Sequence, residues 1–87
     1  MSESPRPAHS YAVQVNQSDG KMLLVRGMDA FELDDVAEFI WGLCDGTHTA
    51  EDIASAVAKE FDVTPERALK DVDAFLKDLL SARLLEN

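Results

Sequence analysis

The sequence predicts a small α+β domain in which a three-stranded antiparallel sheet at the N-terminus is followed by three helices. Alternating apolar residues and an Asp-Gly pair near the start indicate strands. Three capped segments between residues 33 and 85 then have apolar residues at helical spacing, and the connections between them are very short. With the last helix the longest, this order is typical of a winged helix-turn-helix domain.

The first two strands are expected on either side of a tight turn. Tyr11, Val13 and Val15 occupy alternate positions and would face one side of the sheet, which suits a half-buried strand. Asp19-Gly20 favours a two-residue hairpin, because both residues tolerate the left-handed conformation. Residues 21 to 26 then form a strand with apolar residues at both odd and even positions, so we expect other parts of the protein to cover both of its faces.

A third strand is expected at Ala30 to Leu33, with Phe31 and Leu33 facing the core and the alternate residues on the other face. A sheet of three strands has at least one unpaired edge. Such an edge beside a helix is a potential site for an extended peptide.

Each of the three helices has its own start signal. Asp34 or Asp35 can cap the first helix, and Asp45-Gly46 can end it. Thr49 is a suitable N-cap for the second helix, and Thr64-Pro65 begins the third, since proline in the first turn loses no needed hydrogen bond. Most of the apolar stripes on these helices are expected to form the core.

Size and charge limit the possible functions. The chain has 87 residues, and a domain of this size buries only about 60 to 65% of the surface that its unfolded chain exposes, so little apolar material remains for a catalytic cavity. Eight basic residues against 17 acidic ones give a net charge of −9, which disfavours nucleic acid and anionic membranes. Residues 1 to 10 are expected to be a flexible arm and residues 11 to 87 the domain. We expect a cytoplasmic protein without a membrane anchor.

Catalysis and metal binding are not expected. Cys44 is the single cysteine and lies on an apolar helical stripe, where a thiol behaves as a small hydrophobic group. The two histidines, His9 and His48, fall in the arm and in a turn, so neither is placed to activate the thiol or to complete a metal site with it. Trp41 is expected to be structural. We predict no cofactor and no metal.

Two motifs carry a resemblance to a known family. The run from Ile40 to Thr49 has the form Ile-Trp-x-Leu-x-Asp-Gly-x-x-Thr, and the run from Asp71 to Leu76 has the form Asp-Val-x-x-Phe-Leu. In this order and separation they resemble the PqqD-like family, over about residues 11 to 87. These are leader-peptide recognition domains, or RiPP recognition elements, of pathways that modify ribosomally made peptides. Where the family commonly has glycine before the final Leu-Leu, this chain has Arg83, so the third helix is expected to end without a glycine cap. Residues 25 to 28 also differ from the segment expected of a pyrroloquinoline quinone chaperone. We therefore expect the pathway of this protein to make a product other than pyrroloquinoline quinone.

The resemblance implies a non-catalytic protein that captures the leader of a precursor peptide as an added β-strand and presents it to a modifying enzyme, such as a leader peptidase, cyclase or radical SAM enzyme. The third strand and one flank of the third helix would form the site. Phe75 is expected to be mainly a core residue, and Asp71 could equally form a plain surface ion pair with Arg67. The expected peptide-binding residues are Ala30, Phe31, Glu32, Leu33, Arg67, Asp71, Ala74, Phe75 and Asp78.

Two other functions are also found among small domains of this kind, namely transcriptional regulation by a winged helix and transport of a bound group by an acidic helical carrier protein. A winged-helix transcriptional regulator needs a basic recognition helix, whereas the second helix here has three acids against Lys59 alone. An acidic carrier protein needs an attachment serine in an Asp-Ser-Leu-like context, which none of the serines has. The unpaired edge also allows either a monomer or an edge-paired homodimer.

Overall fold

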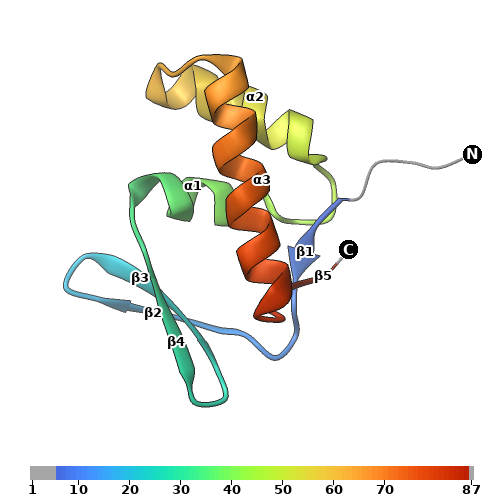
Figure 1. The fold of residues 1–87 in the computed structure, drawn as a ribbon. Helices are drawn as coiled ribbons and strands as arrows, with labels where there is room; N and C mark the ends of the chain where they lie inside the picture. The colour runs from blue at the N-terminus through green and yellow to red at the C-terminus, as the bar shows by residue number, and fades with distance from the viewer. Residues whose placement is uncertain (1–5, 87) are drawn as a thin grey trace, which may run out of the picture.

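A computed structural model describes residues 6–86 (Figure 1). A three-stranded antiparallel sheet, in the order β2-β3-β4, is followed by three helices, and the two ends of the chain form a separate two-stranded sheet. This architecture confirms the predicted α+β fold. The elements are β1 (Ala8–His9), β2 (Gln14–Ser18), β3 (Lys21–Arg26), β4 (Asp29–Leu33), α1 (Asp35–Leu43), α2 (Ala50–Phe61), α3 (Pro65–Ser81) and β5 (Leu85–Glu86).

Two-residue turns fix the register of the sheet. Asp19 and Gly20 join β2 to β3 with φ values of 54° and 79°, as expected for the predicted Asp-Gly hairpin. Gly27 and Met28 join β3 to β4, and Gly27 has a φ of 59°. A Cβ atom at Gly27 would meet nothing within 4 Å, so the requirement for glycine there is conformational rather than steric.

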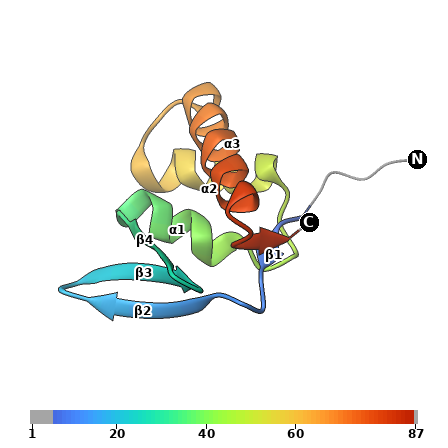
Figure 2. The ribbon, with the colours of Figure 1, turned by 60° about the horizontal axis from the view of Figure 1, so that its bottom comes forward.

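The sheet is covered on one face only. Leu24 and Leu33 are buried against the helices, whereas Leu23 and Val25 point to the opposite face and are half-buried without packing on the core. Among the described elements no helix covers that outer face (Figure 2), which corrects the expectation that both faces of β3 are covered. Val15 also differs from the prediction, because it lies on the inner face but remains 48% exposed.

The N-terminal strand β1 differs from the expected flexible arm. It pairs with β5, and the amide of Gly46 donates to the carbonyl of Pro7 at 2.9 Å (Figure 1). This corrects the prediction for residues 6 to 10, while the rest of the expected arm, residues 1 to 5, lies outside the described residues. Tyr11 is fully exposed, and the first strand of the main sheet begins only at Gln14.

His9 gives this strand a side-chain anchor on α1. Its ring stacks on the indole of Trp41 with 3.7 Å between centroids and an angle of 5° between the planes. Its Nε2–H donates to the carbonyl of Trp41 at 2.7 Å, since a carbonyl can only accept. Trp41 itself is 3% exposed, which agrees with the structural role predicted for it.

The helices begin where the sequence predicts. The side chains of Asp34, Thr49 and Thr64 each accept a hydrogen bond from an amide in the first turn of the helix that follows. At α2 the carboxylate of Asp52 also accepts from the amide of Thr49 at 3.1 Å, which completes a capping box. That hydrogen bond holds the pKa of Asp52 below its usual range.

The C-terminus of α3 is closed by a Schellman motif without glycine. The amide of Leu84 donates to the carbonyl of Leu79 at 2.9 Å, and the amide of Arg83 donates to the carbonyl of Leu80 at 3.0 Å. Arg83 takes the left-handed position with a φ of 62°. The helix therefore ends without a glycine cap, as expected, and Arg83 adopts the strained conformation that glycine would adopt freely.

Replacing Arg83 with glycine should stabilise the protein. A left-handed conformation costs a residue with a Cβ atom roughly 1 kcal/mol, so Arg83→Gly should raise the free energy of unfolding by about 1 kcal/mol and the melting temperature by about 5 °C. Chemical or thermal unfolding measures both. Arg83→Ala removes the same side chain but keeps the Cβ atom, so equal stabilisation by alanine would contradict this account.

Candidate functional site

The free edge of β4 has backbone groups that are available for pairing. Because a two-residue turn is flanked by a hydrogen-bonded pair, Arg26 and Asp29 pair directly, and the pairs alternate along the strand from there. The amides and carbonyls of Ala30 and Glu32 therefore point away from β3. The register across β2 and β3 gives the same alternation, since Ser18 and Lys21 flank the other two-residue turn.

The two edges of the sheet differ in the cover beside them. The inner face of β4 is covered, because Leu33 is 3% exposed and Phe31 packs against the core. Val15 on the inner face of β2 is open to solvent. A strand added beside β4 would thus place its inward side chains next to an apolar, protein-covered surface, which β2 does not offer.

The predicted residues on α3 lie on one flank of that helix. Arg67, Asp71, Ala74 and Asp78 are exposed, and Phe75 beside them is half-buried and packs against the core, as expected. Arg67 and Asp71 form an ion pair of 3.4 Å between exposed side chains, worth only about 0.3–0.5 kcal/mol.

The β4 edge and the α3 flank are not joined by polar side-chain contacts among the described residues. A bound peptide would have to contact both.

Cys44 is unsuited to nucleophilic chemistry. The residue is fully buried, and its thiol donates to the carbonyl of Ile40 at 3.2 Å. Burial, with a smaller contribution from the Asp45 carboxylate, raises the pKa of the thiol to about 12. The thiol is therefore neutral at physiological pH.

The described residues hold no group of three or more His, Cys, Asp or Glu side chains arranged to bind a metal ion. No helix in that part of the chain is long and apolar enough to cross a membrane. The candidate site therefore consists of an exposed strand edge and an exposed helix flank.

Comparison with known proteins identifies the family. The family model described as coenzyme PQQ synthesis protein D (PqqD) matches residues 21–85, which is most of the chain. The chain belongs to the PqqD family. This confirms the resemblance seen in the motifs of α1 and α3. Among curated proteins, no sequence matches.

Solved structures similar to this PqqD-family chain include proteins bound to leader peptides. TbiB1 in complex with the TbiA(beta) leader peptide has a TM-score of 0.79 and 29% identity, over 92% of this chain and 95% of that one. The PqqD truncation of Methylobacterium extorquens PqqCD, described as a functional and stand-alone RiPP recognition element, has a TM-score of 0.77 and 28% identity, over 93% and 88%.

A lasso peptide synthetase B1 complexed with the leader peptide has a TM-score of 0.82 over 94% of this chain and 99% of that one. Its sequence identity is 23%, so this likeness concerns the fold.

Cys44 should resist thiol reagents while the protein is folded. At pH 8 a thiol with a pKa of about 12 carries almost no thiolate, so reaction with Ellman's reagent should be slow in buffer and rapid in 6 M guanidinium. The same shift affects stability. The pKa of the folded thiol lies above the ordinary value of 9.0, so its contribution to the free energy of unfolding is fully present below about pH 9 and declines toward pH 12. Cys44→Ala should lack this decline. Equal rates of reaction with Ellman's reagent in the folded and unfolded protein would contradict a buried Cys44 thiol with a raised pKa.

Proposed function

We propose that this chain is a non-catalytic leader-peptide-binding protein that captures a ribosomal precursor peptide as an added strand on β4 and presents it to a modifying enzyme. The observation that carries the proposal is the open β4 edge, with the backbone groups of Ala30 and Glu32 directed outward. Membership of the PqqD family and the leader complexes of similar structures support it.

Main-chain pairing would supply the affinity and side-chain contacts the specificity. A strand beside β4 forms hydrogen bonds with Ala30 and Glu32 whatever its sequence, and alternate side chains of that strand then point toward the covered inner face. Phe31, which is half-buried, contributes the apolar part of this surface, and Leu33 supports it from the core. Such a protein can therefore hold a peptide in extended form without any reacting group of its own.

The exposed flank of α3 would provide the polar contacts. Asp71 and Asp78 carry negative charge, Arg67 is paired with Asp71, and Ala74 leaves room for the peptide to approach the helix. A bound leader that offers a basic or amide group could compete with Arg67 for Asp71. Because the existing pair is weak, this exchange has little energetic cost.

The product of the pathway is expected to differ from pyrroloquinoline quinone, since residues 25–28 differ from the segment expected of a pyrroloquinoline quinone chaperone. The precursor is made on the ribosome and meets the protein before any export, so we place the encounter in the cytoplasm. The same β4 edge could pair two copies of the chain, and a leader strand would then displace the second copy.

Proline substitutions test which of the two edges of the sheet binds the leader. Ala30→Pro removes an outward amide that does not pair with β3, so the fold should persist while binding of the leader encoded beside this protein weakens about tenfold or more, the loss of about 1.4 kcal/mol. Isothermal titration or fluorescence anisotropy measures the change in Kd.

The matched control is Val15→Pro, which removes an outward amide on the β2 edge and should leave leader affinity unchanged. Equal weakening by both variants would contradict the choice of β4. Binding of the leader by the unmodified protein no tighter than about 100 μM would contradict the proposed function itself.

A further inference from the structure

A surface hollow lies between the start of α1 and the end of α2. It has a volume of about 370 Å³ and is lined by Asp35, Glu38, Phe39, Glu60 and Phe61. The rings of Phe39 and Phe61 meet edge to face, with 5.4 Å between centroids and 83° between planes. Both rings are only half-buried. The hollow thus combines an aromatic floor with a rim of three carboxylates.

The carboxylates of this rim are not neutralised by ion pairs, although Asp35 and Glu38 lie in the first turn of α1, where the helix dipole favours negative charge. In the part of the chain that the structure describes, the ion pairs are Lys21–Glu32, His48–Asp45 and Arg67–Asp71, and none of them includes a carboxylate of the rim. Three unpaired acids around apolar rings disfavour an acidic or purely apolar occupant. They complement a segment with basic side chains around an apolar anchor.

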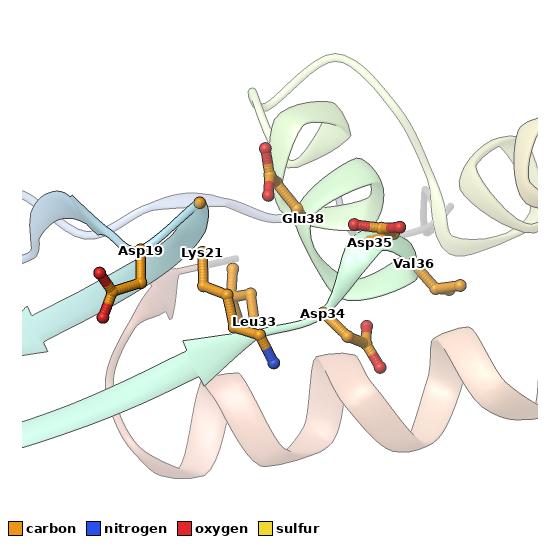
Figure 3. A pocket seen from close by; sticks show the side chains of 8 residues that line it. Asp19, Lys21, Leu33, Asp34, Asp35, Val36 and Glu38 are labelled. Carbon is orange, nitrogen blue, oxygen red and sulfur yellow. The ribbon is translucent and has the colours of Figure 1, made fainter.

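The acidic surface extends toward the turn between β2 and β3. Asp35 and Glu38 also line a neighbouring hollow of about 440 Å³, where Figure 3 shows them with Asp19 and Asp34 around its rim. Lys21, the one basic residue there, is paired with Glu32 on the outer face of the sheet at 3.4 Å. We call the aromatic hollow, which is lined by Asp35, Glu38, Phe39, Glu60 and Phe61, the α1 groove.

The α1 groove shares no residue with the proposed leader site on β4 and α3, whereas the neighbouring hollow is lined in part by Leu33 of that site. Both surfaces can therefore be occupied at the same time. We propose that the α1 groove is the docking site for a basic, apolar-anchored segment of the modifying enzyme, so that the protein holds the leader on one surface and the enzyme on another. This inference rests on the proposed function, because the enzyme is the partner to which a captured leader must be delivered.

A defined peptide tests the chemistry of the groove. The probe is a 15-residue peptide with lysine and leucine at helical spacing, added to the full-length ¹⁵N-labelled protein. Amide shifts should concentrate on residues 35–39 and 60–61, and the analogue with glutamate in place of lysine should cause none. Glu60→Lys should weaken binding of the basic peptide about threefold to tenfold, since each exposed pair contributes up to about 1 kcal/mol.

The matched control is Asp73→Lys, which makes the same change in net charge at an exposed position of α3 outside both hollows. It should reduce peptide affinity much less than Glu60→Lys. Equal effects of the two variants, or shifts spread over the whole surface, would overturn the inference by showing attraction to net charge alone.

Leader affinity should be the same in Glu60→Lys as in the unmodified protein. Loss of leader binding in that variant would also overturn the inference, because the two surfaces would then not be independent. Failure of the unmodified protein to bind its leader would instead reject the proposed function and is measured in a separate titration.

Discussion

The two-residue turn at Gly27 and Met28 is the constraint on which the rest of the site depends. It sets the register between β3 and β4, and the register decides which backbone groups of β4 pair internally and which face outward. A slip of one residue would move Phe31 and Leu33 out of the core and point the wrong amides at a ligand. Because Gly27 has a positive φ, this register is already specified by local chain geometry.

The same small core explains why recognition is confined to the surface. Among the residues that the structure describes, fourteen buried apolar residues, from Leu24 on the sheet to Leu85 in the last strand, form a single cluster. Trp41 and Cys44, the residues most suggestive of chemistry, belong to this cluster and are held there by His9 and by the carbonyl of Ile40. What remains for function is a strand edge, the flank of α3 and the α1 groove. Each of these suits a macromolecular partner better than a small reactive substrate.

Local signals in the sequence were sufficient for most of the fold. The caps at Asp34, Thr49 and Thr64 and the Asp19-Gly20 turn act within a few residues, so pattern alone located the helices and the first hairpin. The strand pair β1–β5 was missed because each strand has only two residues and the pairing joins opposite ends of the chain. No periodic pattern can reveal such a pair.

Other differences arise from tertiary context. Val15 has the correct parity for burial, yet it remains 48% exposed at that edge of the sheet. The chain also ends α3 in a Schellman motif with arginine, because packing of Leu84 and Leu85 in the core outweighs the local strain at Arg83. The strand edge and the family were identified from sequence, and the site residues proposed there remain a prediction. The contact between Phe39 and Phe61 was not foreseen, since it joins two helices whose relative placement the sequence does not encode locally.

Amide hydrogen exchange along β4, with and without leader peptide, tests the central claim most directly. In the unbound protein the amides of Phe31 and Leu33 should exchange slowly because they pair with β3, whereas those of Ala30 and Glu32 should exchange rapidly. Saturation with the leader should protect Ala30 and Glu32 and leave the β2 edge unchanged. Rapid exchange at Ala30 and Glu32 that persists in the saturated complex would show that the leader does not add as a strand on β4.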